Sequence, residues 1–253
     1  MCTLVILFQP EQRWPLILAG NRDEMRDRPS APPSHHWPAQ PDVIAGLDHL
    51  GGGTWMGMNR AGVVATVMNR EGTLGPATGK RSRGDLVLEA LKASSAKAAV
   101  ETVKSIPAHH YRAFNLFIGD RQNCFWLRNR DEGEMPELEA FRIEPGLHML
   151  TSRELDDRSH PRIDFWLPLF QNARPPVPEQ QMWEEWIQLL AGRMNASLAN
   201  PHAAMNMDFP MGFATVSCSL IALAQSPDQD RPIWMYADGA PDRVEFTPVE
   251  MEA

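Results

Sequence analysis

Four residues near the start of the chain have the types and spacing of a nucleophilic site. Cys2 directly follows Met1, and because small second residues generally permit removal of the initiator methionine, Cys2 would become the mature N-terminus. It would then carry a thiol nucleophile together with a free α-amine, whose pKa of about 7.7 to 8.0 suits a general base. One residue could therefore supply two catalytic groups.

The charged segment that begins at Asn21 could supply the remaining groups. A thiol with a pKa of about 8.5 is mostly protonated at neutral pH, and a nearby cation activates it. Arg22 is the expected cation. Asp23 would accept a hydrogen bond from the protonated α-amine or orient Arg22, and Asn21 could donate its amide hydrogens to a developing oxyanion. On a regular strand, however, the adjacent side chains of Arg22 and Asp23 would face opposite ways.

The elements around these residues must bring two chain segments together. Residues 2–8 and 16–19 are apolar runs of strand length, and antiparallel pairing between them would return residues 21–23 to the neighbourhood of Cys2. Residues 29–41 hold five prolines, which favour an extended loop that could act as a lid. A hairpin could thus bring Cys2 and residues 21–23 together at its open end.

Further strand patterns alternate with two helical blocks. Helices are expected within 85–106, as one or two elements, and within 179–198. Strands are expected at 62–69, 113–118, 124–128, 147–151, 213–223, 233–236 and 244–246, with a turn at Gly119-Asp120. Two strand-rich blocks, each followed by helices, predict an α+β fold in which helices cover antiparallel sheets. No composition shift marks a linker, so residues 1–253 are expected to form a single domain.

Composition excludes several classes of partner. The 253 residues have a formal net charge of -8, which would repel phosphate backbones, so no nucleic acid is expected to bind. No apolar run approaches the roughly 18 residues of a membrane span, and no secretory signal is recognisable, so we expect a cytoplasmic protein without a transmembrane segment. Three scattered cysteines do not form a disulfide framework, and reduced thiols are expected.

Other motifs have simpler interpretations. Adjacent histidines at 35–36 and 109–110 cannot both bind one metal from a strand, so no metal site is predicted. No covalent haem attachment motif is present, although 14 methionines leave non-covalent haem binding open. Residues 51–53 are all glycine but lack the Lys-Ser/Thr of a phosphate-binding loop, which favours a structural turn.

Several motifs in combination resemble the transport and Golgi organisation family, which is named for its NRDE motif. The most specific are Met1-Cys2, AGNRDE at 19–24 with Arg28-Pro29, and GGTWMG at 52–57; weaker ones lie at 62–69, 82–87, 114–116, 119–120 and 215–219. The resemblance implies an N-terminal-nucleophile hydrolase type of fold, the four-layer αββα sandwich of cholylglycine hydrolases and penicillin V acylases. In those acylases an arginine and an aspartate follow the hairpin after an N-terminal cysteine, but they are separated there and adjacent here.

The resemblance also implies functions. Trp55, Asn69 and Asn115 lie in the matching motifs and are expected to bind substrate. Many members have an asparagine where this chain has Ser152, whose hydroxyl can donate one hydrogen bond, and Ser152 is not included in the expected site. Two functions stay open. One is an amidohydrolase or acyl-transfer enzyme that acts on non-peptide C–N bonds of a small molecule through Cys2 and needs no cofactor. The alternative is a non-catalytic carrier of haem or an acyl-type lipid, in keeping with the association of eukaryotic members with secretory-pathway organisation, lipid and acyl-CoA metabolism and haem trafficking.

Overall fold

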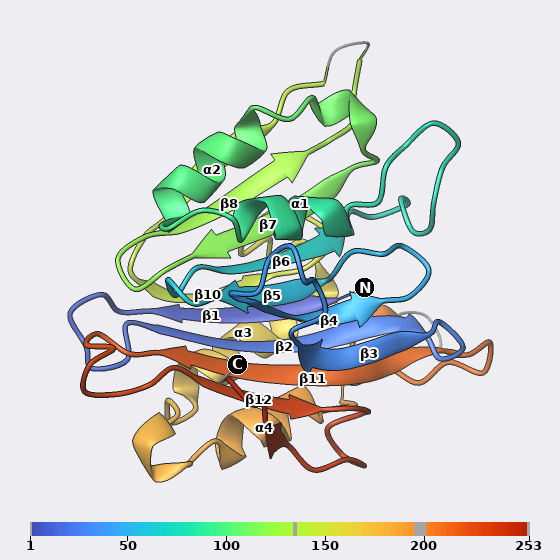
Figure 1. Ribbon diagram of the computed structural model, residues 1–253. Coiled ribbons are helices and arrows are strands. Elements are labelled where there is room, and N and C mark those ends of the chain that lie inside the picture. Colours follow the sequence, from blue (N-terminus) through green and yellow to red (C-terminus); the bar gives the residue numbers. More distant parts are fainter. Residues whose placement is uncertain (1, 134–135, 195–200, 252–253) are drawn as a thin grey trace. The chain divides into compact units, whose positions relative to one another are not determined.

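The computed structural model describes residues 2–133, 136–194 and 201–251 (Figure 1). The chain divides into two compact units, of which one comprises Met1–Asp27 with Pro145–Val249 and the other Arg28–Glu144 with Glu250–Ala253. Each unit holds one antiparallel sheet with its own helices, which confirms the α+β class. That the 253 residues fold as a single domain stays a prediction.

The first unit contains a six-stranded sheet. Its strands are β1 (Thr3–Phe8), β2 (Leu16–Met25), β10 (Gly146–Leu150), β11 (Phe213–Leu223), β12 (Ile233–Ala237) and β13 (Thr247–Pro248), in the spatial order β10-β1-β2-β11-β12-β13. Figure 1 shows β1, β2, β11 and β12 side by side. The predicted β1–β2 hairpin is present, with Phe8 opposite Leu16 and Thr3 opposite Asn21. The helical elements of this unit are α3 (Pro161–Asn172), α4 (Glu184–Leu190), η2 (Pro178–Gln180) and η3 (Pro201–Ala203).

The two faces of this sheet have different roles. Because side chains alternate along a strand, the odd-numbered residues of β1 and β2 face the helices. Val5, Ala19 and Leu220 pack there against Trp166 of α3 and Trp186 of α4. The even-numbered residues of β1 and β2, including Arg22, therefore face the other way. Cys2 precedes β1 and is even-numbered, so the same alternation assigns it to this second face.

The second unit contains a seven-stranded sheet whose strands follow one another in chain order. They are β3 (Ser30–Ser34), β4 (Val43–Asp48), β5 (Met56–Asn59), β6 (Val64–Asn69), β7 (Phe114–Gly119), β8 (Cys124–Asn129) and β9 (Glu139–Ile143). Between β6 and β7 come α1 (Gly84–Ala90) and α2 (Ala96–Lys104), followed by η1 (Ala108–His110). Leu86 and Val100 from the helices share a core with Ala65, Leu116 and Leu127 of the sheet.

The glycines at 51–53 form a close-packed turn, as predicted. Gly52 has a φ of +69°, which favours glycine. A Cβ atom on Gly53 would come within 2.6 Å of the carbonyl carbon of Gly84 at the start of α1, so the backbones touch there. The motif therefore serves the packing of this unit.

Several element predictions require correction. Asn21, Arg22 and Asp23 lie within β2, which extends to Met25, rather than after the strand. The proline-rich segment includes β3, an edge strand, where missing N–H donors are tolerated. The second helical block is shorter than 179–198, since α4 has seven residues, and positions 195–198 lie outside the described residues. The last strand is 247–248 instead of 244–246.

Besides β3, four elements were not predicted: α3, β4, β5 and β9. In α3, Pro161 occupies the first turn and Pro168 lies inside the helix, which interrupts the helical pattern in the sequence. Within the described part of the chain, none of the helices has the length and apolar character needed to cross a membrane.

Candidate active site

Cys2 lies at the open end of the β1–β2 hairpin beside the NRDE segment. Its thiol donates a hydrogen bond to the main-chain carbonyl oxygen of Asp23, with an Sγ to O distance of 3.7 Å. The side chain is part-buried, and burial raises the pKa of the Cys2 thiol; the Asp23 charge raises it further, whereas the Arg22 charge lowers it. The Arg22 charge thus lowers the pKa of the Cys2 thiol, which is the direction that activation of a nucleophilic thiol requires.

A row of polar residues crosses the sheet at this level. Arg22 is paired with Ser217 of β11. The pairing of β1 with β2 ends at Thr3, and its continuation by one residue would place Cys2 opposite Arg22. The pairing of β1 with β10 ends at Leu4 and Leu150, and its continuation by two residues would place Ser152 on the other side of Cys2. The three side chains of Arg22, Ser217 and Ser152 are all buried. The row Ser152–Cys2–Arg22–Ser217 is hereafter called the Cys2 row.

Tyr236 of β12 completes the polar surroundings of the Cys2 row. Its hydroxyl donates a hydrogen bond to Asp238 at 3.4 Å. Burial raises the pKa of Tyr236 to about 12, although a hydrogen bond with Ser217 and the Arg22 charge both lower it. A neutral phenol therefore lies on the face that carries Cys2.

Asp23 faces away from the Cys2 row. Its carboxylate lies 3.1 Å from Nη1 of Arg162 in α3, and neither side chain is exposed at all. The hydroxyl of Thr215 also donates to this carboxylate, at 2.7 Å. Arg162 in turn donates to the Thr3 hydroxyl at 2.6 Å. The alternation of strand side chains thus places Asp23 and Arg22 on opposite faces of the sheet. Asp23 acts on Cys2 through its main-chain carbonyl oxygen, which accepts the thiol hydrogen bond, and through its charge, which raises the thiol pKa.

Asn21 is also on the helix-covered face. Its side-chain amide nitrogen donates to the main-chain carbonyls of Leu190 and Met205, each at 3.0 Å. Both amide hydrogens are therefore engaged in this structure, and the expectation that Asn21 donates them to an oxyanion stays a prediction. Asn21 thus ties β2 to the last residue of α4 and to the segment that contains Met205.

The three expected substrate-binding residues belong to the second unit. Trp55 packs over Gly46, where a Cβ atom would lie 2.3 Å from its ring. Asn69 is the last residue of β6 and is half-buried. Asn115 is fully buried in β7, where its side-chain oxygen accepts from Arg70 at 2.8 Å and from Trp126 at 3.1 Å. Their role in substrate binding stays a prediction.

Sequence reasoning missed Arg162, Thr215, Ser217 and Tyr236. Around Arg162 the sequence contains a helical spacing of apolar residues at 163, 166, 167 and 170 after His160-Pro161, but Pro168 interrupts it. No local pattern indicates that this helix places an arginine against Asp23. Among the described residues there is no group of three or more His, Cys, Asp or Glu side chains that could hold a metal ion.

The fold is that of the N-terminal-nucleophile hydrolases. Similar solved structures include penicillin V acylase from Agrobacterium tumefaciens, with 14% sequence identity, a TM-score of 0.52, and coverage of 94% of this chain and 83% of that one. An orthologue of N-acylethanolamine-hydrolyzing acid amidase from Caenorhabditis elegans has 11% identity and a TM-score of 0.55, over 87% and 92% of the two chains. A variant of conjugated bile acid hydrolase from Clostridium perfringens has 11% identity and a TM-score of 0.57, over 100% and 94%.

The chain belongs to the Transport and Golgi organisation 2 family, which it matches over residues 1–213. The Transport and Golgi organization protein 2 homologue of Bos taurus is 30% identical over 171 residues, which are 62% of this chain and 58% of that protein. The Mus musculus homologue is 28% identical over 188 residues, 68% of this chain and 64% of that protein. The match thus spans about three fifths of the length of these relatives.

Proposed function

We propose that this protein is a cysteine N-terminal-nucleophile amidohydrolase or acyl-transfer enzyme that acts on a small-molecule amide. The observation that carries the proposal is the Cys2 row, in which a part-buried thiol lies beside the Arg22 cation at the open end of the first hairpin. Family membership and the fold shared with acylases support it. The fold alone does not supply an activity, so the argument rests on the site.

The reaction uses the two groups of a mature Cys2 after removal of Met1. The α-amine takes the thiol proton, and Sγ forms a bond to the substrate carbonyl carbon. Collapse of the tetrahedral intermediate breaks the C–N bond, the ammonium protonates the leaving amine, and a thioester remains on Cys2. Attack by water, with the α-amine again as base, releases the carboxylic acid and restores the thiol. Another nucleophile in place of water completes an acyl transfer.

The chain's own side chains have distinct roles in this scheme. Arg22 counteracts the effect of burial on the pKa of the Cys2 thiol. Asp23 holds β2 in place through Arg162, while its carbonyl oxygen borders the thiol. Ser152, across from Cys2 in the continued β1–β10 pairing, is the donor that we propose for the oxyanion. These steps need no cofactor, and a reducing compartment such as the cytoplasm would keep Cys2 as a thiol.

The first experiment is the intact mass of native, untagged protein, followed by an amide-hydrolysis assay. Loss of one methionine frees the Cys2 α-amine, whereas complete retention of Met1 blocks it and overturns the mechanism. The printed names of the structural neighbours suggest the substrate panel: penicillin V, an N-acylethanolamine and a conjugated bile acid.

Two cysteine variants make the assay specific. Cys2→Ala should abolish amine release and the covalent acyl adduct seen by mass spectrometry. Cys218→Ala is the matched control, because Cys218 pairs with Asn21 and carries its thiol on the helix-covered face. Full activity in Cys2→Ala would contradict the proposal. Saturable haem or acyl-CoA binding without any turnover would favour carriage instead.

A further inference from the structure

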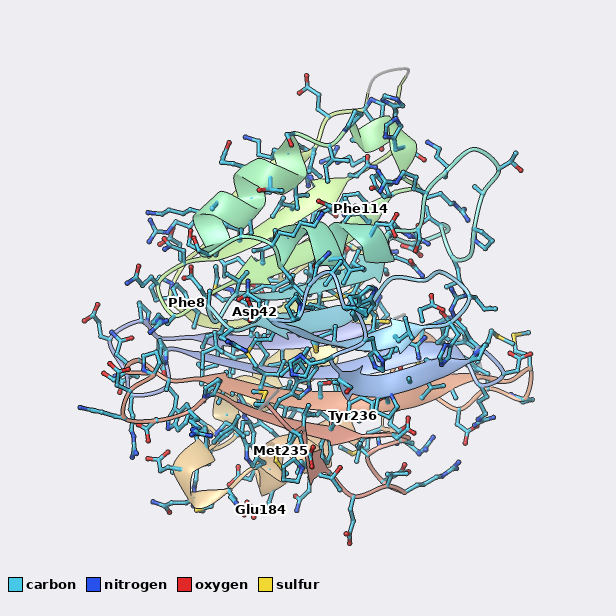
Figure 2. All side chains as sticks on the ribbon, viewed as in Figure 1. Phe8, Asp42, Phe114, Glu184, Met235 and Tyr236 are labelled. Carbon is cyan, nitrogen blue, oxygen red and sulfur yellow. The ribbon has the colours of Figure 1, made fainter. Side chains whose placement is uncertain are left out.

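A groove of about 550 Å³ lies on the helix-covered side of the first unit's sheet. Trp183, Glu184 and Ile187 at the start of α4 line one side, and Leu220 of β11 with Met235 of β12 form the floor. The other side is the segment 241–246 between β12 and β13. Figure 2 labels Glu184 and Met235, which mark α4 and the floor of the groove.

This groove is separate from the Cys2 row. Met235 and Tyr236 are neighbours on β12, and strand alternation points them to opposite faces. Met235 packs with the helix-side core, whereas Tyr236 interacts with Ser217 and Arg22 of the Cys2 row. Both residues are labelled in Figure 2. A ligand in the groove would therefore not occupy the proposed active site.

The groove has the size and the walls of a small-molecule site. Ligand pockets are typically about 300 to 1,000 Å³ and mainly apolar with a few polar groups. The segment 241–246 is held in place by a turn in which Arg243 and Val244 both donate main-chain hydrogen bonds to Ala240. Val244 also packs on Gly239, where a Cβ atom would lie 2.4 Å from it. The wall is thus fixed by its own contacts.

The charges at the rim favour a cation. Asp242 is bound to Arg193 at 2.9 Å and Arg243 to Asp208 at 2.8 Å, so these two rim charges have partners. Glu184 and Glu245 are exposed, and neither forms an ion pair with another residue in the part of the chain that the structure describes. Two carboxylates therefore border a groove whose floor is formed by Leu220 and Met235.

We propose that this groove binds a small hydrophobic cation, an aliphatic or aromatic body that carries one protonated amine or quaternary ammonium. The apolar body lies on the partly exposed side chains of Met235, Ile187 and Phe246, where its burial supplies the affinity. The ammonium lies at the rim near Glu184 and Glu245. The two rim carboxylates disfavour an anionic amphiphile at the same position.

Calorimetric titration with alkyltrimethylammonium ions of six to ten chain carbons, below their micellar concentrations, tests the proposal. Affinity should rise about fourfold for each added methylene that is buried. Decanoate should bind at least tenfold more weakly than decyltrimethylammonium. The variant Glu184→Gln/Glu245→Gln should weaken decyltrimethylammonium binding about fivefold, since both carboxylates lie at exposed positions. The methyl resonance of Met235, assigned with Met235→Leu, should shift during the titration.

A matched control separates site binding from attraction to the net charge of -8. Glu11→Gln/Glu101→Gln removes the same charge from two exposed positions outside the groove and should leave affinity unchanged. Equal weakening by both double variants would overturn the proposal. Affinity that does not depend on chain length, or a Met235 methyl resonance that does not move, would also overturn it.

Discussion

The thiol of Cys2 lies 3.7 Å from the main-chain carbonyl oxygen of Asp23, and the carboxylate of Asp23 is bound to Arg162 on the other face of the sheet. Asp23 therefore borders the nucleophile with its backbone and anchors β2 with its side chain. The anchor includes Thr3, which immediately follows Cys2 and accepts a hydrogen bond from the same guanidinium. The position of Cys2 thus depends on a buried ion pair that does not itself face the site.

Removal of one member of this ion pair should be costly. Arg162→Met leaves the Asp23 carboxylate buried without its cation, and breaking a buried pair in this way typically destabilises a protein by about 3 to 5 kcal/mol. In the double variant Arg162→Met/Asp23→Asn no charge remains, so the loss should be smaller than the sum of the single losses. Urea unfolding measures the free energy of unfolding of Arg162→Met, of Asp23→Asn and of the double variant.

The control for this prediction is an exposed ion pair at the start of α3, in which Arg158 precedes the helix and Asp164 lies in its first turn. Arg158 and Asp164 are 3.9 Å apart with side chains 51% and 67% exposed, so Arg158→Met should change stability by no more than about 0.5 kcal/mol. A loss in Arg162→Met as small as that in Arg158→Met would show that the pair does not anchor the sheet.

Arg22 should control the reactivity of Cys2. The Arg22 charge lowers the pKa of the Cys2 thiol, so Arg22→Gln should raise that pKa and slow alkylation by iodoacetamide at pH 8. The whole curve of rate against pH should move to higher pH. Burial raises the pKa of Cys124 and Cys218 well above the usual range, so these thiols should contribute little background. Arg60→Gln, at a 71% exposed side chain, should leave the curve in place.

Tyr236 should make the folded protein sensitive to alkaline pH. Burial raises its folded-state pKa to about 12, above the ordinary value of about 10, so the native state favours the neutral phenol. The associated stability is fully present below pH 10 and is lost as the pH rises to 12, which amounts to about 3 kcal/mol. Tyr236→Phe should abolish this part of the alkaline loss, as measured by urea unfolding between pH 9 and 12.

An absorbance titration checks the same prediction independently. The chain has 2 tyrosines, and Tyr111 also has a pKa raised by burial. Tyr236→Phe should remove the later of two tyrosinate transitions in the folded protein. Ionisation of both tyrosines near pH 10 before unfolding would contradict the assigned burial of Tyr236.

The fold could be predicted from the sequence wherever periodicity and turn chemistry are local. The β1–β2 hairpin, the two helices within 85–106 and the turn after β7 are present as predicted. The helix α3 was not predicted because Pro168 interrupts its apolar pattern, while packing of Trp166 and Phe170 against the sheet stabilises it. The burial of these side chains against the sheet outweighs the local destabilisation by Pro168, and this burial cannot be inferred from the local sequence pattern.

The candidate site was predictable only in part for a similar reason. The positions of Cys2 and Arg22 follow from a hairpin, and the opposite orientation of Asp23 follows from strand alternation. Ser217 and Tyr236 come from strands about 200 residues further along the chain, and only the order β1-β2-β11-β12 brings them to the Cys2 row. Local spacing contains no information on that order.

Variants of Asn21 can distinguish a structural role of its side chain from a catalytic one. Its two amide hydrogens bind the carbonyls of Leu190 and Met205, so Asn21→Ala leaves two buried acceptors without their donor. We expect a loss of about 1 to 3 kcal/mol in the free energy of unfolding for each unsatisfied group. Turnover per folded molecule should change little, because the amide does not reach the reacting atoms.

A large loss of turnover in Asn21→Ala with little loss of stability would instead indicate that Asn21 is an oxyanion donor. Removal of such a donor typically lowers kcat about 100- to 1,000-fold while the fold stays intact. Asn21→Asp sharpens the comparison, because a carboxylate cannot donate to the two carbonyls and adds a charge at a buried position. Its destabilisation should therefore exceed that of Asn21→Ala, whereas an oxyanion donor would lose the same hydrogen bond in both variants. Unfolding and single-turnover measurements on the two variants decide between these roles.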